Sequence, residues 1–78
     1  MNASTDRPPR FVREREVVHT TGLSRTQLRR LEHSGRFPRR VPLSDRAFGW
    51  LEREIQAWIA GRLSARDQML TVEESVRL

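Results

Sequence analysis

The segment Leu23–Gly35 has the clearest pattern of hydrophobic and polar positions in the chain. At about 100° per residue, Leu28 and Leu31 fall on one side of a helix, and Glu32 lies at the edge of the other side. That other side is polar and basic, and it carries Arg25, Thr26, Arg29, Arg30 and His33. The pattern predicts an amphipathic helix with one face for a hydrophobic core and one strongly basic face.

The ends of this helix are marked by local signals. Ser24 is a favourable N-cap, and Gln27 three residues later completes a capping box. Leu23 and Leu28 occupy the two positions of a hydrophobic staple. Gly35 supplies a residue that tolerates positive φ just after the last turn. We therefore expect the helix to begin directly after Ser24 and to end before Gly35.

A shorter helix is predicted before it, from Glu14 to Thr20, with Val17 and Val18 on its buried side. Thr21–Gly22 then turns the chain into the basic helix. Two helices joined by a tight turn that contains glycine match the helix-turn-helix pattern. Further upstream, Phe11–Val12 is predicted to form a short strand or an anchoring segment.

Hydrophobic residues also alternate on either side of the polar turn Ser44–Arg46, which predicts a two-stranded hairpin. These residues are Val41, Leu43, Phe48 and Trp50. Pro42 lacks a backbone N–H, so its strand is expected at an edge of the sheet. A hairpin directly after a basic helix of this kind is a wing.

The longest periodic segment, Leu51 to Arg62, predicts a third helix that closes the core. Its apolar stripe consists of Leu51, Ile55, Trp58, Ile59 and Leu63. Trp50 and Trp58 are interpreted as packing residues, because aromatic stripes at helical spacing are usually core.

Three parts of the chain follow from these elements. Residues 1–10 are polar and contain Pro8–Pro9, so we expect a disordered N-terminal tail. Residues 11–63 form one folded domain. Residues 64–78 hold further capping patterns and scattered apolar residues. They extend or follow the third helix, form a docking tail for another protein or a second copy, or are a frayed terminus.

Net charge is unevenly distributed along the 78 residues. The whole chain carries +5, and residues 20–50 alone carry seven arginines against two acids. Residues 1–19 contribute +1 and residues 51–78 contribute −1. A basic region of this kind, centred on the amphipathic helix, is typical of nucleic-acid-binding proteins.

Composition argues against several other classes of protein. Without cysteine there is no disulfide framework, and His19 and His33 have no partners at ligand spacing, so we expect neither a metal nor a cofactor. No catalytic arrangement or glycine-rich loop is visible, so we do not expect an enzyme. No apolar run approaches the about 20 residues that span a bilayer, and no signal peptide is visible. We expect a soluble cytoplasmic protein without membrane contact.

Four short motifs resemble the AlpA family of small prophage and mobile-element regulators. They are TGLSR at 21–25, GRFP at 35–38, RAFGW at 46–50, and a helix containing Glu54 and Ala57–Trp58. Together they cover residues 12–62. The family consists of winged helix-turn-helix proteins related to the MerR DNA-binding domain and to phage excisionases. The resemblance implies a single domain that is mainly α with a small β-hairpin, a MerR-like winged helix-turn-helix.

The resemblance also implies binding to double-stranded DNA, with the basic helix in the major groove and the wing on the minor groove or the backbone. The helix residues expected to contact DNA are Ser24, Arg25, Thr26, Gln27, Arg29 and Arg30. Arg25 and Arg29 can each donate two hydrogen bonds to a guanine edge. Beyond the helix, Arg36, Arg39 and Arg40 are expected to hold phosphates, and Arg46 is expected to contact DNA from the wing.

The sequence departs from the family pattern at three places. Arg29 stands where an aromatic residue is common, and Ser44–Asp45 replaces a glycine-rich wing tip. Glu14 stands where an apolar residue is usual. The first two departures bear on the target sequence and the wing contact, and the third bears on where the first helix starts.

Two roles on DNA are consistent with these motifs: an excisionase, which is a recombination directionality factor, and a transcriptional regulator. Either role would make the protein nucleoid-associated. A single module of this size buries only about 600 to 1,000 Å² on DNA. We therefore expect cooperative self-association on DNA or a partner such as an integrase. The alternative function is a protein-interaction module, an inhibitor or adaptor that binds another protein through the winged-helix fold and the C-terminal tail.

Overall fold

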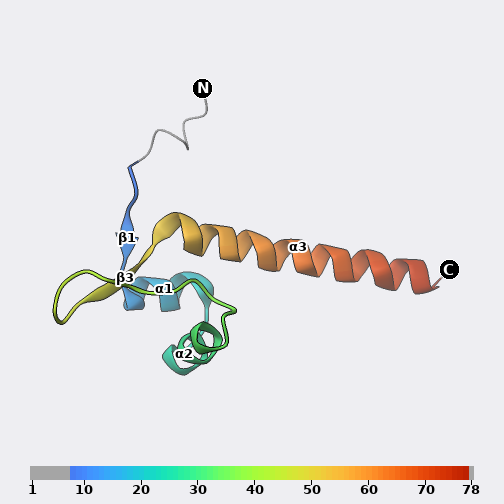
Figure 1. Ribbon diagram of the computed structural model, residues 1–78. Helices are drawn as coiled ribbons and strands as arrows, with labels where there is room; N and C mark the ends of the chain where they lie inside the picture. The colour runs from blue at the N-terminus through green and yellow to red at the C-terminus, as the bar shows by residue number, and fades with distance from the viewer. Residues whose placement is uncertain (1–7, 78) are drawn as a thin grey trace.

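The computed structural model describes the backbone of residues 8–77 and the side chains of residues 8–69. Figure 1 shows a small antiparallel sheet with three helices, the last of which is much longer than the others. The elements in chain order are β1 (Phe11–Val12), α1 (Glu14–Thr21), α2 (Arg25–His33), β2 (Val41–Pro42), β3 (Phe48–Leu51) and α3 (Glu52–Arg77). This mainly helical fold with a β-hairpin is a winged helix-turn-helix, as predicted.

Helix α1 and the turn that follows it form the first half of the helix-turn-helix. The helix begins at Glu14, as predicted, and ends at Thr21, one residue later than predicted. Gly22 adopts a left-handed conformation with φ of 76°, and its N–H donates to the carbonyl of Val18 at 2.9 Å. The Thr21 hydroxyl donates to the carbonyl of Val17 at 2.8 Å. These bonds satisfy the last carbonyls of α1 and fix the direction in which the chain leaves it.

Both ends of α2 are capped as the sequence predicts. The Gln27 N–H donates to Ser24 Oγ at 3.1 Å, and the Ser24 N–H donates to Gln27 Oε1 at 2.9 Å, so the capping box is complete. At the other end Gly35 has φ of 76°, and the Arg36 N–H donates to the Leu31 carbonyl at 2.8 Å. This arrangement is a Schellman motif, and it confirms Gly35 as the residue that follows the last turn.

The three strands form an antiparallel sheet in the order β1-β3-β2. Strand β2 lies at an edge, which confirms the prediction from Pro42, and the segment Phe11–Val12 is a strand that pairs with β3. The paired positions are Phe11 with Leu51, Val12 with Trp50, Val41 with Gly49, and Pro42 with Phe48. The hairpin of β2 and β3 is the predicted wing, and it projects away from α3 (Figure 1).

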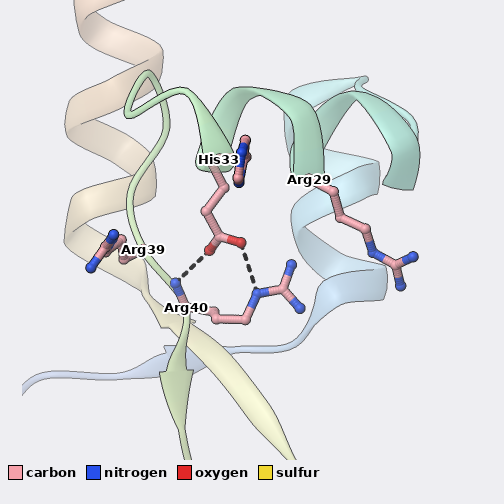
Figure 2. Close-up of a pocket in the computed structure, with 5 residues that line it drawn as sticks. Arg29, His33, Arg39 and Arg40 are labelled. Carbon is pink, nitrogen blue, oxygen red and sulfur yellow. Dashed lines mark hydrogen bonds and ion pairs between the residues drawn. The ribbon is translucent and has the colours of Figure 1, made fainter.

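The segment between α2 and β2 is held to the helix by one acidic side chain. Glu32 Oε2 accepts from the backbone N–H of Arg40 at 2.6 Å, and Glu32 Oε1 accepts from Arg40 Nε at 2.8 Å (Figure 2). Both side chains are largely buried, with exposed fractions of 15% for Glu32 and 29% for Arg40. The base of the wing is therefore tied directly to the last turn of α2.

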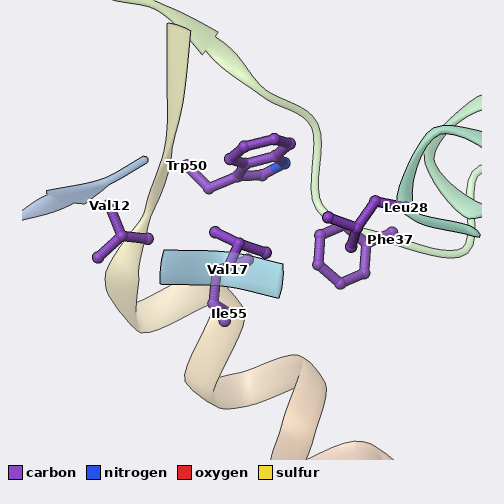
Figure 3. Close-up of a cluster of buried hydrophobic side chains, with 6 residues drawn as sticks. All are labelled: Val12, Val17, Leu28, Phe37, Trp50 and Ile55. Atoms are coloured by element: carbon purple, nitrogen blue, oxygen red, sulfur yellow. The ribbon is translucent and has the colours of Figure 1, made fainter. Parts of the chain in front are cut away.

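The hydrophobic core draws on every helix and on two strands (Figure 3). Its buried members are Val12, Val17, Leu28, Phe37, Trp50 and Ile55. Trp50 is fully buried, and its indole N–H donates to the carbonyl of Pro38 at 3.0 Å. Trp58 is half-buried, stacks edge-on against Phe37 at 4.9 Å between ring centroids, and donates to the carbonyl of Arg36 at 2.8 Å. Both tryptophans are packing residues, and both also anchor the chain between α2 and β2.

Helix α3 packs on the core only through its first part. It begins at Glu52 rather than at Leu51, because Leu51 is still paired in β3. Ile55 is buried, whereas Leu63 is 50% exposed, so the prediction that Leu63 joins the core stripe is wrong. The backbone of residues 64–77 continues the same helix away from the sheet (Figure 1). Among the described residues, no helix is both long and apolar enough to cross a bilayer.

The N-terminal tail expected over residues 1–10 falls mostly on residues 1–7, which lie outside the described residues. At its end, Arg10 is tied to the domain. The Arg10 carbonyl accepts from the Glu52 N–H at 2.7 Å, and its guanidinium lies 3.3 Å from carboxylate oxygens of both Glu16 and Glu52. Arg10 therefore extends the contact between β1 and the start of α3.

Candidate nucleic-acid interface

The polar face of α2 points to solvent because the apolar face of the helix packs on the core. Leu28 is fully buried and Leu31 is half-buried against the core. The side chains on the opposite face are all exposed, and they are Arg25, Thr26, Arg29, Arg30 and His33. This face of the helix is the first part of the candidate interface.

Most arginines of the basic region make no internal ion pair. Within the described residues, five of the seven arginines between positions 20 and 50 have no carboxylate within 4.0 Å: Arg29, Arg30, Arg36, Arg39 and Arg46. Each of these five side chains is exposed. Their charge is thus not compensated within the described part of the protein, and it is available to a negatively charged partner.

Three arginines lie around one depression beside α2. A shallow depression of about 530 Å³ lies between the C-terminal half of α2 and the segment that leads into β2. Its lining residues are Arg29, Glu32, His33, Arg39 and Arg40 (Figure 2). Both oxygens of Glu32 already accept hydrogen bonds from Arg40, so this carboxylate is neutralised by its own neighbour. The depression therefore favours an anion such as a backbone phosphate.

His33 is a lining residue that was not among the site residues predicted from the sequence. It lies four residues after Arg29, so both side chains stand on the same face of α2. That spacing was visible in the sequence. What could not be seen was that the segment containing Arg39 and Arg40 folds back beside them.

Arg40 was expected to be free to contact a phosphate, but most of its guanidinium contacts other side chains of the protein. Its Nε donates to Glu32, and its guanidinium carbon lies 4.2 Å from the ring centroid of Phe48 and 5.2 Å from that of Trp50. Its two terminal nitrogens donate no hydrogen bond within the described residues. Arg40 thus braces the wing, and only the outer edge of its guanidinium remains for a ligand.

Ser24 and Gln27 are exposed at the start of α2, but both are used in the capping box. Gln27 Oε1 accepts from the backbone of Ser24, which holds the amide close to the helix end. The Gln27 amide nitrogen is the group of this side chain that stays available for an acceptor on a ligand.

Arg25 stands at the first position of α2, and it is paired across the helix-turn-helix. Its Nε lies 3.2 Å from Oε1 of Glu14, the first residue of α1. The Arg25 side chain remains 66% exposed, whereas that of Glu14 is only 16% exposed. The sequence did not predict this ion pair, because the two residues are eleven positions apart and meet only when α1 and α2 pack.

Arg46 lies in the turn at the tip of the wing, where Ser44 and Asp45 are also exposed. The turn is closed by two backbone hydrogen bonds to the Ala47 carbonyl, from the N–H groups of Leu43 at 2.8 Å and Ser44 at 3.2 Å. Arg46 is therefore carried at the end of the hairpin, separate from the depression beside α2. Among the described residues, no group of three or more His, Asp or Glu side chains is arranged to hold a metal ion.

Comparison with known proteins identifies the family. Residues 10–63 match the family of the prophage CP4-57 regulatory protein (AlpA). The chain is also 44% identical over 57 residues to the uncharacterized protein ORF88 of Enterobacteria phage P4. That alignment covers 73% of this chain and 65% of ORF88, so the chain spans just under two thirds of this relative. No solved structure matches the chain. The match over most of the folded domain shows that this chain belongs to the AlpA family of prophage regulatory proteins.

Proposed function

We propose that this protein binds specific sequences of double-stranded DNA, with α2 in the major groove and the wing on the minor groove or the backbone. The observation that carries the proposal is the set of exposed arginines without internal ion pairs, on α2 and on the segment that joins it to the wing. Unpaired arginines at this density match the charge of a phosphate backbone.

Base reading is assigned to the exposed face of α2. Arg29 and Arg25 carry forked guanidinium groups that can each donate two hydrogen bonds to O6 and N7 of a guanine. Thr26 and the amide nitrogen of Gln27 suit the edges of adenine or thymine. Arg30 is exposed on the same helix and is proposed to contact base edges or the adjacent backbone.

Phosphate contacts are assigned to the groups around this face. The N-terminus of α2, which follows Ser24, favours a negative charge through the N–H groups that the capping box does not use. Arg36 and Arg39 are exposed on the segment after α2, and Arg40 offers the outer edge of its guanidinium. Arg46 at the wing tip is proposed to contact the minor groove or the backbone. Such contacts fix the register of the protein without selecting bases.

The proposed biological role is that of a prophage or mobile-element protein, either an excisionase or a transcriptional regulator. Membership in a family of prophage regulators supports both roles. An excisionase would bend its site and contact an integrase, whereas a regulator would occupy a promoter. Because one module buries only about 600 to 1,000 Å² on DNA, several copies or an integrase are proposed to complete the complex. The role is non-catalytic and places the protein on the cytoplasmic nucleoid.

One observation favours the alternative function, a protein-interaction module. Leu63 is 50% exposed and Met69 is 65% exposed on the part of α3 that leaves the core. A protein partner held by this part of α3 would stay bound when the arginines of α2 are removed, whereas a DNA ligand would not.

A gel shift across a salt series tests the proposal, with duplexes from the attachment site and the promoter of the mobile element. Arg29→Ala and Arg46→Ala are expected to weaken binding and to flatten its salt dependence, by about one unit of slope for each phosphate that the variant no longer neutralises. Arg62→Ala is the matched control, because it removes an exposed arginine from α3. Unchanged affinity and slope in both interface variants would contradict the proposal.

A further inference from the structure

The carboxylate of Glu14 has an unusual environment for an acidic side chain on a small domain. Its Oε1 lies 3.2 Å from Nε of Arg25, but its Oε2 is buried and has no hydrogen-bond partner in the described part of the chain. A buried oxygen without a partner loses its hydration and gains nothing in return. Folding stability alone therefore gives no reason for an acid at this position.

Two structural explanations of Glu14 are incomplete. An acid in the first turn of α1 is favoured by the helix dipole, but Glu16 provides the same effect from an exposed position. An ion pair with Arg25 adds little to stability, because the Arg25 side chain is 66% exposed and screened by water. An apolar side chain at position 14 could fill the same space without an unpaired oxygen.

The pair is better explained by what it does to Arg25. Glu14 lies 3.2 Å from the guanidinium at Nε, and the two terminal nitrogens of Arg25 donate no hydrogen bond within the described residues, so they remain a free fork. Those two nitrogens are sufficient for hydrogen bonds to O6 and N7 of one guanine. Because Glu14 is largely buried at the start of α1, it is a fixed anchor, and a long exposed side chain is held in fewer conformations before it meets DNA.

The charge of Glu14 acts in the same direction. An arginine without a partner attracts any phosphate, whatever the sequence beside it. With Glu14 at 3.2 Å, part of the charge of Arg25 is compensated, and the contribution of Arg25 to binding depends more on the direction of its hydrogen bonds. Arg36, Arg39 and Arg46, which have no such partner within the described residues, provide affinity for the backbone instead.

We infer that Glu14 is a positioning residue for sequence recognition: it holds Arg25 so that its fork reads one guanine of the target, at the expense of affinity for DNA in general. This inference rests on the proposed function and adds a specificity determinant to it. Its signature is that removal of Glu14 changes specific and non-specific binding in opposite directions.

The test starts with wild-type protein and a pool of random duplexes, from which the preferred sequence is selected. Fluorescence anisotropy then measures affinity for that duplex, for versions in which each guanine is replaced in turn, and for a random duplex. The variants are Glu14→Leu, Glu14→Gln and Arg25→Ala, with Glu16→Gln as the control. Glu16 is also in the first turn of α1, but its carboxylate pairs with Arg10 and not with a residue of α2. Circular dichroism checks that each variant is folded.

Glu14→Leu is expected to lose about tenfold in its preference for guanine over other bases at one position of the target. Arg25→Ala is expected to lose preference at that same position. Glu14→Gln keeps an acceptor for Arg25 and is expected to lose less. Glu14→Leu is expected to bind random duplex at least as tightly as wild type and with a steeper salt dependence, and Glu16→Gln is expected to match wild type in discrimination.

Two outcomes would overturn the inference. Glu14 has only a structural role if both Glu14 variants lose affinity equally for every duplex, or if both keep full discrimination between duplexes. Glu14→Gln decides this even where Glu14→Leu does not fold. These results leave DNA binding by the wild type intact. If instead wild-type protein selects no sequence from the pool, the proposed function and this inference fail together.

Discussion

Glu32 and Arg40 join α2 to the wing through two hydrogen bonds, both donated by Arg40 and accepted by the carboxylate of Glu32. The Arg40 N–H and Nε donate at 2.6 and 2.8 Å to the two oxygens of Glu32, and the guanidinium also covers the ring of Phe48 at 4.2 Å. The orientation of the wing relative to α2 is thereby set by side chains outside the hydrophobic core.

Loss of this carboxylate is expected to weaken the fold. Glu32→Ala should lower the free energy of unfolding by about 2 kcal/mol, because two donors of Arg40 lose a charged acceptor. Glu32→Gln, which keeps one acceptor oxygen, should lose less. Urea denaturation followed by circular dichroism measures the effect. Asp45→Ala is the control, since it removes an exposed acid from the wing tip and should change stability by no more than about 0.5 kcal/mol. Equal stability of the Glu32 and Asp45 variants would contradict the conclusion that the hydrogen bonds between Glu32 and Arg40 stabilise the fold.

Gly49 and Gly61 are expected to respond to alanine in opposite directions. A Cβ at Gly49, in the central strand β3, would lie 2.9 Å from the Val12 carbonyl oxygen and 3.1 Å from Leu43, so the strands must move apart. We expect Gly49→Ala to cost about 1 to 3 kcal/mol. At Gly61, inside α3, nothing lies within 4 Å of the added Cβ, so Gly61→Ala should stabilise by about 1 kcal/mol. Thermal melts compare the stability of the two variants. A Gly49→Ala protein more stable than wild type would contradict the close approach of β1 to β3 at Gly49.

The two tryptophan anchors are expected to differ in strength. Trp50→Phe removes a partly buried hydrogen bond to Pro38 and leaves a cavity at a fully buried site, so we expect a loss of about 2 kcal/mol or more. Trp58→Phe removes an exposed hydrogen bond to Arg36, whose carbonyl can turn to water, and about 1 kcal/mol or less is expected. Urea denaturation of the two variants under identical conditions gives the comparison. The reverse order of stability would contradict the burial of Trp50 as the centre of the core.

The features that could be predicted from the sequence are those formed by neighbouring residues. Ser24 and Gln27 are three positions apart, and Gly35 directly follows the last turn. Residues within one short segment therefore determine where α2 begins and ends. The same holds for the wing, where alternation around a polar turn predicts the hairpin and Pro42 predicts its edge. Local hydrogen-bonding patterns need no knowledge of the rest of the chain.

The features that were missed depend on contacts between elements. Nothing in a linear pattern shows that Arg40 folds back onto Glu32, or that Arg25 meets Glu14, since each pair forms only when two elements pack. Leu63 continues the helical stripe in sequence, yet α3 has already passed the edge of the small core at that point. Periodicity indicates which side of a helix is apolar, but it does not tell how far the core extends along it.

Titration of ¹⁵N-labelled protein with its duplex, followed by NMR, tests most directly whether α2 and the wing form the DNA-binding surface. Shifts in amide and arginine Nε signals are expected to gather on α2, on residues 36–40 and at Arg46. Signals from residues 62–69 of α3 are expected to stay unchanged at one protein per site. Shifts confined to α3, with the signals of Arg29 and Arg30 unmoved at saturation, would contradict the assignment of this surface to DNA.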